Sequence, residues 1–546
     1  MRMTTPTKPP AAAQQAPTAE FLRAKAQAER GVAGAQHSLG FMYFNGQGVA
    51  PSYELAVVWY RQAALQGMPQ AQYNLGVMFQ KGQGVAQDFQ EAAAWYQLAA
   101  SQGYAAAQYN LGWLYARGQG VAADTRQAMH WFSKAASQGD AGAQNNLAMM
   151  YDTGKGVPQD PVQALHWYRK AAEQGYARAQ YQLGLRYENS QGLTPEMADV
   201  GQAMSWYRKA AEQGYAPAQF NLALRFDKGD GVAQDSQKAI LWYRRAAEQD
   251  HASSQFNLGL IYDNGQGVPR DEQKALDWYR KAAAKGHAGA QNNLGLRYYH
   301  GQGVAQDYVE AHAWYGKAAA QNFPGAQYHL GQLHDAGHGV PADAQAATDW
   351  YRKAAEQGHL RAQFDLGLRY ETARGAPHDL RQAQAWYRRA AEQDYAAAQY
   401  HLGLLYDRAD GPQPGPLSGL QPDPQQAGHW YARAARQGHT LAQFALGLRY
   451  DNGQGVAQDY AQALHWYALA AAQGHARAQF NLGLMYLAGQ GARADAAQAW
   501  TWLALAHRGG HAAAARYLAS AAARLDAAQL AQAHARLDNL PAIASA

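Results

Sequence analysis

Apolar and small residues recur along this chain in a pattern that repeats every 36 residues. Each copy starts at an Ala-Gln step, or once at Ser-Gln, and its apolar positions follow at the three- and four-residue spacing that indicates an amphipathic helix. Two such segments, separated by glycines, make up one copy and predict a helical hairpin. Thirteen copies start at Ala35, Ala71, Ala107, Ala143, Ala179, Ala218, Ser254, Ala290, Ala326, Ala362, Ala398, Ala442 and Ala478.

The second copy shows what each position is expected to do. Residues 71–79 predict a first helix, which ends at Gly82-Gln83-Gly84, where glycine can adopt positive φ. Asp88 then opens a second helix, and twelve of the thirteen copies have an Asp at this place. An Asp carboxylate there can accept the free amides of the first turn. We therefore interpret these Asp residues as helix caps and not as catalytic acids.

Residue size predicts how the hairpins pack. Gly76 and its equivalents allow two backbones to approach closely, while Leu75, Phe79 and Trp95 and their equivalents fill the space between layers. We expect the Trp positions to belong to the core.

Two copies are longer than the rest: the fifth has 39 residues because of an insertion near Ser190, and the eleventh has 44 because of a Pro- and Gly-rich insertion near Pro412. Both insertions fall between the two helices of a copy and predict surface loops. The expected organisation is a disordered tail (1–17), a capping helix (18–34), thirteen repeats (35–511), a capping helical hairpin (512–540) and a tail (541–546).

The complete motif is Ala-Gln-x-Asn-Leu-Gly-x-x-Tyr-x-x-Gly-x-Gly-Val-x-x-Asp, followed by Trp-Tyr, Ala-Ala and Gly. It resembles the Sel1-like repeat family, whose members are related to tetratricopeptide repeats. The resemblance implies an all-α fold, a right-handed α-solenoid superhelix whose first helices line a concave groove that binds other proteins. Cysteine-rich members of the family join each hairpin by a disulfide, which this chain, without cysteine, cannot do.

Counting from the Ala of the Ala-Gln step as position 1, similarity to tetratricopeptide arrays implies that positions 3, 4, 7, 10 and 11 line the groove. Position 3 is usually aromatic and could anchor apolar partner side chains, or pack against the adjacent repeat. Its aromatic members are Tyr73, Tyr109, Tyr181, Phe220, Phe256, Tyr328, Phe364, Tyr400, Phe444 and Phe480.

Position 4 is often Asn, whose carboxamide could hold a peptide backbone or form a hydrogen bond that ties one repeat to the next. These residues are Asn74, Asn110, Asn146, Asn221, Asn257, Asn293 and Asn481. Position 10 is acidic in eight copies, all among the fourth to twelfth, and five copies of that stretch have Arg at position 8, so these charges are expected to pair. Basic pairs such as Arg169-Lys170 on the second helix are interpreted as a solvated outer face.

Six histidines at one place near the end of the second helix raise the question of a metal site: His251, His287, His359, His439, His475 and His511. Tyr stands at the same place in other copies, which favours an aromatic packing site. One histidine per layer cannot assemble a coordination sphere. We therefore expect no metal and no cofactor.

Composition narrows the remaining classes of function. The formal charge of +5 over 546 residues is too small to favour nucleic acid, and no apolar run is long enough for a membrane span. No signal peptide stands out, so we expect a cytoplasmic protein, an extracytoplasmic one being the alternative. The leading hypothesis is a scaffold that binds a protein or peptide and is not an enzyme. The alternatives are a hydrolase acting on cell-wall or glycan material, whose site should interrupt the repeat, and a nucleic-acid binder using the basic convex face.

Overall fold

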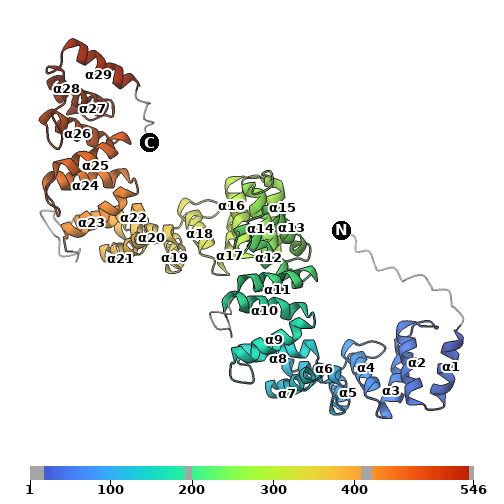
Figure 1. Ribbon diagram of the computed structural model, residues 1–546. Helices are drawn as coiled ribbons and strands as arrows, with labels where there is room; N and C mark the ends of the chain where they lie inside the picture. Colours follow the sequence, from blue (N-terminus) through green and yellow to red (C-terminus); the bar gives the residue numbers. More distant parts are fainter. Residues whose placement is uncertain (1–16, 191–198, 408–420, 540–546) are drawn as a thin grey trace. The chain divides into compact units, whose positions relative to one another are not determined.

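The computed structural model describes residues 17–190, 199–407 and 421–539, which form 29 α-helices and no strand (Figure 1). The predicted tails, 1–17 and 541–546, lie outside these residues except for Pro17, and so do most of the insertions near Ser190 and Pro412. The chain divides into two compact units, residues 1–271 and 272–546, and each is described by itself.

The first unit contains one N-terminal helix, six complete hairpins and the first helix of the seventh repeat. In order, its helices are α1 (Ala19–Glu29), α2 (Ala33–Asn45), α3 (Tyr53–Leu65), α4 (Pro69–Lys81), α5 (Phe89–Ser101), α6 (Ala105–Arg117), α7 (Thr125–Ser137), α8 (Ala141–Thr153), α9 (Pro161–Glu173), α10 (Ala177–Asn189), α11 (Val200–Glu212), α12 (Ala216–Lys228), α13 (Ser236–Ala247) and α14 (Ala252–Asn264). Even numbers from α2 onward are first helices, and the odd numbers that follow are second helices.

The second unit begins with the second helix of the seventh repeat, continues with six hairpins and ends in two further helices. In order, its helices are α15 (Glu272–Ala284), α16 (Ala288–His300), α17 (Tyr308–Ala319), α18 (Pro324–Ala336), α19 (Ala344–Glu356), α20 (Leu360–Thr372), α21 (Leu380–Glu392), α22 (Ala396–Asp407), α23 (Pro424–Arg436), α24 (Thr440–Asn452), α25 (Tyr460–Ala472), α26 (Ala476–Ala488), α27 (Ala496–Arg508), α28 (Ala514–Ala522) and α29 (Ala527–Asn539).

The helices begin and end at the residues that the pattern predicts. Before α5, Asp88 Oδ1 accepts the backbone amides of Gln90 and Glu91 at 2.8 and 3.1 Å, and α4 ends at Gly82 with φ of 68°. These contacts satisfy backbone groups that a helix terminus otherwise leaves without partners. The capping role expected for the Asp residues is therefore confirmed.

The core of each layer consists of small residues around a leucine and a tyrosine. Leu75 and Tyr96 are both fully buried, and a Cβ on Gly76 would lie 2.7 Å from the Tyr96 ring. In the Trp-Tyr pair it is the tyrosine that is buried completely. Trp131, Trp386 and Trp430 are buried as expected, but Trp95 and most other members of its position are only half-buried. The expectation that the Trp row belongs to the core was therefore only partly right.

The second glycine of several turns has a packing role that positive φ alone does not reveal. Gly84 has φ of 71°, and a Cβ added to it would lie 2.3 Å from the backbone carbon of Tyr53, in the preceding repeat. Gly120 stands in the same relation to Phe89, with a carbonyl oxygen at 2.0 Å. The turn is therefore also a contact between layers, where backbone approaches backbone.

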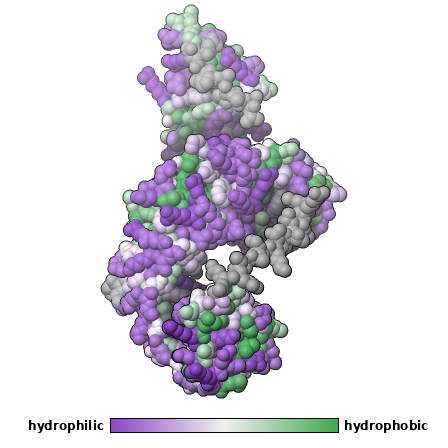
Figure 2. All heavy atoms as spheres, turned by 90° about the vertical axis from the view of Figure 1, so that its right-hand side faces the viewer, coloured by the Kyte–Doolittle hydropathy of each residue, from purple (hydrophilic) through white to green (hydrophobic). Residues whose placement is uncertain are grey.

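Each end of the array is covered by helices outside the regular hairpins. Phe21 of α1 is buried, and its ring meets that of Tyr43 edge-on at 5.3 Å. At the other end α28 and α29 pack on α27, where Trp500 and Leu537 are buried. Elsewhere hydrophobic patches are scattered over a mostly hydrophilic surface (Figure 2). Within the described residues no helix is long and apolar enough to cross a lipid bilayer.

Candidate functional site

The aromatic residues of position 3 pack on rings of their own repeat, on the second helix and just after it. Tyr73 on α4 lies 5.9 Å from the Tyr96 ring of α5 and 5.3 Å from the Tyr104 ring, which precedes α6. Most members of the row, Phe256 included, are half-buried, and Tyr328 is buried. Equivalent ring contacts are made by Tyr109, Tyr181, Phe220, Tyr328, Phe364, Tyr400, Phe444 and Phe480. Packing inside the hairpin thus accounts for much of each ring, and contact with the adjacent repeat adds to it in places, as between Phe364 and His401 with ring centroids 5.3 Å apart.

The asparagines of position 4 also reach across the boundary between repeats. Asn221 Nδ2 donates to the Tyr181 hydroxyl at 3.5 Å, and Asn74 Nδ2 lies 3.0 Å from Nε2 of His37. Asn146 and Asn293 each accept from the asparagine that precedes them at 3.4 Å. These carboxamides therefore form hydrogen bonds within the array.

The three remaining asparagines lie against second-helix tyrosines of the preceding repeat. Burial raises the pKa of Tyr243, and its side-chain hydrogen bond with Asn257 opposes that rise. Asn110 and Asn481 act in the same way on the pKa of Tyr96 and Tyr467, respectively.

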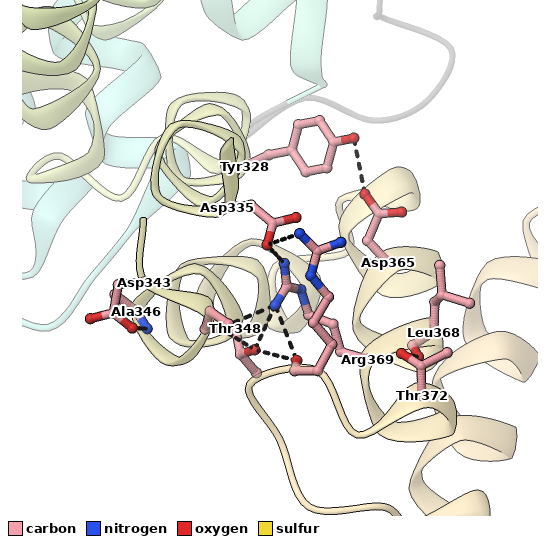
Figure 3. A network of polar contacts seen from close by, with 11 residues as sticks. Tyr328, Asp335, Asp343, Ala346, Thr348, Asp365, Leu368, Arg369 and Thr372 are labelled. Carbon is pink, nitrogen blue, oxygen red and sulfur yellow. Dashed lines mark hydrogen bonds and ion pairs between the residues drawn. The ribbon is translucent and has the colours of Figure 1, made fainter. Parts of the chain in front are cut away.

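The charges of positions 8 and 10 pair, as expected, and they do so between consecutive repeats. Arg369 of α20 lies 2.5 Å from Asp335 of α18, and its Nη1 donates to the hydroxyl of Thr348 at 3.1 Å (Figure 3). The other pairs of this kind are Arg186 with Asp152, Arg225 with Glu188, and Arg449 with Asp407. All four arginines are buried. Their charges therefore stabilise the contact between consecutive repeats and are not accessible to a ligand.

Tyrosine hydroxyls engage the same row of acids from the second helix. Tyr387 donates to Glu371 at 2.7 Å, and Tyr467 donates to Asp451 at 3.1 Å. In one copy an acid also takes position 4: Asp365 accepts from the Tyr328 hydroxyl at 3.0 Å, and burial raises the pKa of Asp365 (Figure 3). Most acidic side chains on this face therefore have hydrogen-bond or ion-pair partners within the array.

The basic pairs of the second helices divide into two roles. Arg169 Nη2 donates to the Tyr187 hydroxyl of the next repeat at 3.2 Å, while Lys170 Nζ lies 4.8 Å from the centre of the Trp167 ring. The same cation–π contact recurs at eight other Trp residues of the described part of the row, for example Lys317 over Trp314 at 3.7 Å. These residues cover the half-buried indoles, which explains why aromatic and basic residues occur together on this face.

The six histidines each stand immediately before, or near the start of, the helix that follows. His475 packs on Phe444 with ring centroids 4.5 Å apart, and its Nδ1 accepts the Ala478 amide at 3.1 Å. His251, His287, His359 and His439 also cap their helices through Nδ1. The row thus provides aromatic packing sites, as expected, and five of its six members are also helix caps, which the residue pattern did not indicate. Among the described residues no three His, Asp or Glu side chains are placed to share a metal ion.

A row of buried glutamines was missed altogether, although it defines the start of each copy. Gln72 is 4% exposed; its Nε2 donates to the Ala64 carbonyl at 3.2 Å, and its Oε1 accepts from Gln102 at 2.8 Å. It thereby joins the end of one second helix to the end of the next, using a carbonyl that the helix terminus leaves available. The same two bonds are made by Gln36, Gln108, Gln144, Gln180, Gln219, Gln291, Gln363, Gln399 and Gln443. The signal was the invariant Gln at position 2.

Two clefts in the first unit are built from the same repeat positions. The Tyr73 cleft, of about 430 Å³, includes Lys81 of α4, Asn110 of α6 and Gln119 in the following turn. One repeat later the Trp113 cleft, of about 330 Å³, has Arg117, Asn146 and Lys155 at the equivalent places. Val77 and Trp113 occupy position 7 in the two clefts, and Gln80 and Ala116 occupy position 10. Positions 4, 7, 10 and 11 therefore do meet in a hollow between layers.

Side-chain size explains the Trp113 cleft. Ala116 stands where later repeats have an acid, and Met150 of the next repeat stands where they have the partner arginine. The short side chain of Ala116 and the absence of an ion pair leave a space over Phe132 and Met149. The volume is in the range of pockets that bind ligands.

A comparison with protein families matches the repeat unit along nearly the whole chain. The family is described as Sel1 repeat, and it matches thirteen times: residues 33–68, 69–104, 105–140, 141–176, 177–215, 216–251, 252–287, 288–323, 324–359, 360–395, 396–439, 440–475 and 476–511. No curated protein matches the chain.

Solved structures with similar chains are also repeat proteins. A protective antigen of uropathogenic Escherichia coli with an SLR fold is 31% identical, with a TM-score of 0.47, over 97% of this chain and 99% of that one. A Sel1 repeat protein from Oxalobacter formigenes is 32% identical, with a TM-score of 0.42, over 45% of this chain and 96% of that one. A Pseudomonas aeruginosa immunity protein is 25% identical, with a TM-score of 0.28, over 40% of this chain and 81% of that one.

Proposed function

The chain belongs to the Sel1 repeat family, and from that premise we propose that it is a scaffold that binds a segment of a partner protein along the first-helix face of its repeats. Repeats of this kind generally mediate protein–protein interactions. Activity in this proposal consists of recognition, without a bond-forming or bond-breaking step.

The observation that carries the proposal is the recurrence of the Tyr73 cleft one repeat later as the Trp113 cleft. Equivalent hollows in consecutive layers can receive successive side chains of one extended segment, as repeat proteins do along their binding surfaces. Each hollow combines apolar side chains with a carboxamide, Asn110 in one and Asn146 in the other. An asparagine there can donate to and accept from a peptide backbone.

Within the groove residues expected from the sequence, the proposal therefore concentrates on a few. Tyr73 and Asn110 line the first cleft and Asn146 lines the second. The other aromatic residues of position 3 and asparagines of position 4 are proposed to shape the surface around the clefts, since their contacts within the array determine the positions of the clefts. A partner would make its strongest contacts at the hollows, because buried anchors dominate most interfaces.

The place where the repeat pattern weakens does not favour the hydrolase alternative. The turn at residues 372–377 lacks the first glycine, yet Ala373 adopts φ of 56° and Gly375 keeps φ of 66°. The turn thus keeps the conformation of the other copies. We propose a binding role without catalysis, and no observation on the described residues favours a hydrolase or a nucleic-acid binder over it.

The test places a photo-crosslinking amino acid in the full-length chain inside its native cell. Ala116, in the Trp113 cleft, is the test position, and Leu98, 49% exposed on the second helix α5, is the matched control. We expect discrete covalent adducts with a small set of proteins from position 116 and none of these from position 98. Adducts that are identical at both positions, or none at position 116, would overturn the proposal.

A further inference from the structure

The two clefts differ from the rest of the array in their charge. Lys81 lines the Tyr73 cleft, and Arg117, Lys155 and Arg178 line the Trp113 cleft, whereas no acidic residue lines either one. All four cationic side chains are exposed. Among the described residues, none of the four has a carboxylate within ion-pair distance. Their charge is therefore available to a ligand.

Acids near the Trp113 cleft are already engaged. Asp152, the first acid of position 10, lies 2.6 Å from the buried Arg186. Asp124 and Asp140 accept backbone amides at the starts of α7 and α8. An anionic group entering the cleft would consequently meet three cations without a competing free carboxylate on its walls.

The floor of the Trp113 cleft consists of apolar side chains, among them flexible methionines. Met149, 37% exposed, lies beside Met150 and Phe132, and Arg178 Nη2 is 3.9 Å from the Met149 sulfur. The Arg117 guanidinium stacks over the Trp113 ring, 3.3 Å from its centre. Thioether side chains adapt to varied apolar shapes, and a stacked guanidinium still presents its edge N–H groups to a carboxylate. The cleft thus fits an apolar side chain next to an acidic one.

Resting on the proposed function, we infer that the partner segment is an acidic peptide that carries carboxylates on both sides of an apolar residue and binds across repeats two to four. Consecutive layers of packed helices lie about 10 Å apart. An extended chain covers about 3.3–3.6 Å per residue. Acidic side chains about three residues apart would therefore reach Lys81 of one cleft and Arg117 of the next, while the apolar residue enters between Trp113 and Met149.

The charge pattern favours a peptide over a nucleic acid. The basic stretch covers only these clefts, because the acids of position 10 begin at Asp152 and continue through Asp451. A polyanion that follows a longer stretch of the surface would meet those acids, whereas a short acidic peptide would not. Complementary charge of this kind acts mainly on partner choice and association rate.

The inference is tested on the full-length chain by fluorescence anisotropy with three labelled twelve-residue peptides. In the first, Glu recurs at every third position with Leu and Met between; in the others Gln or Lys replaces Glu. We expect the Glu peptide to bind at least about tenfold more tightly than the Gln peptide, with affinity falling as salt rises, and the Lys peptide not to bind.

The test variant is R117E/K155E/R178E, and the matched control is K228E/R477E. Lys228 and Arg477 occupy the repeat positions of Arg117 and Arg178, are exposed, and lie in other repeats. The test variant should lose about tenfold or more in affinity for the Glu peptide, while the control should bind as the parent does. The three replaced side chains at the cleft and the two in the control are all exposed, so circular dichroism should show unchanged helicity.

Equal binding of the Glu and Gln peptides, or full binding by the test variant, would overturn the inference. So would tighter binding of a twelve-nucleotide oligothymidine than of the Glu peptide, which would indicate a phosphate ligand. This outcome can be distinguished from failure of the proposed function. If position 116 gives adducts but the Glu peptide is not preferred, the acidic-peptide inference is wrong and the scaffold proposal stands. No adducts at position 116 reject the scaffold itself.

Discussion

Either histidine or tyrosine usually stands at the residue before a first helix, because that residue has two roles: it packs on an aromatic ring and it can cap the helix. A flat ring there packs on the aromatic residue of position 3, as His439 does on Tyr400 at 4.8 Å and Tyr104 does on Tyr73. The following helix also needs an acceptor for a first-turn amide, which an imidazole nitrogen provides and a tyrosine at this place does not. Asp140 shows the opposite compromise, since it caps α8 but has no ring.

These histidines predict acid sensitivity. Burial lowers the pKa of His287, His359, His439 and His475, and each Nδ1 must keep its lone pair to cap. Because the folded-state pKa lies below the unfolded value of about 6.5, their contribution is present above pH 6.5 and is lost as pH falls below it. Thermal unfolding at pH 7.5, 6.5 and 5.5 should show the midpoint dropping most over the last step.

Substitutions at His475 separate its two roles. H475Y keeps the ring but loses the cap, so we expect a loss of about 0.5–2 kcal/mol at pH 7.5 and a smaller further loss at pH 5.5 than in the parent. H475D keeps a cap but loses the stacking on Phe444. A further variant replaces His287, His359, His439 and His475 together by Tyr. If the stability of this variant depends on acid as that of the parent does, the capping explanation is wrong.

The buried arginines make a second prediction at the scale of single residues. R369M should destabilise the second unit by about 3 kcal/mol, because it removes the buried guanidinium that contacts both Asp335 and Thr348 and leaves Asp335 only the exposed Arg374. The double variant R369M/D335A reproduces Met150 above Ala116, a combination that the chain already contains, and should recover much of the loss. Urea unfolding of the parent, R369M, D335A and the double variant gives the coupling energy of the pair. Additive effects of the two substitutions would contradict a direct pair.

Residue patterns revealed some of these roles and concealed others. The Asp caps and the pairing of arginines with acids could be predicted, since both follow from residue type and period. The pairing across repeats and the bond from Gln102 to Gln72 could not, because they join residues about 30 or more apart in the chain and require the register of one layer on the next. The histidine caps are local, but the alternation with Tyr indicated only a ring at that place.

At the scale of the hairpin, the turn glycines differ in what they contribute. The first ends a helix in the left-handed region, where Ala373 and Ser190 also occur. The second adds a close approach: a Cβ on Gly455 would lie 2.2 Å from the Pro424 carbonyl oxygen, whereas one on Gly453 would meet only Gln458 Cβ at 3.3 Å. Alternation of glycine in the sequence indicates a turn but does not distinguish these two functions.

G455A should therefore cost clearly more than G453A. For G453A we expect about 1 kcal/mol, the usual penalty for alanine with positive φ. G455A adds a collision with backbone that cannot move without separating two layers, and we expect a total of about 3 kcal/mol or more. Chemical denaturation monitored by helical circular dichroism measures both. Equal losses would show that the second turn is flexible enough to remove the contact.

For the molecule as a whole, the period was sufficient to predict thirteen stacked hairpins, because each exposes an apolar face that only another hairpin can cover. It was not sufficient to predict the clefts. The Trp113 cleft depends on Ala116, Met150 and Arg178, which come from the three consecutive first helices α6, α8 and α10 and have no distinctive pattern in the sequence. Position 10, which Ala116 occupies, was expected to face a groove, whereas the positions of Met150 and Arg178 were not. Which copies would be hollow follows only from the packed side chains.

The terminal helices provide the last prediction. α28 and α29 cover Trp500, whose ring lies 4.3 Å from His534, and bury Leu503 and Leu537 against α27. A chain ending at Gly510 would expose this face, so its last repeats should unfold at lower urea concentration than in the parent and bind a hydrophobic dye. Because contacts in such arrays are between neighbours, the first unit should keep its stability, and the Glu peptide should bind unchanged. A uniform loss of stability along the chain would instead mean that the repeats unfold as one cooperative block.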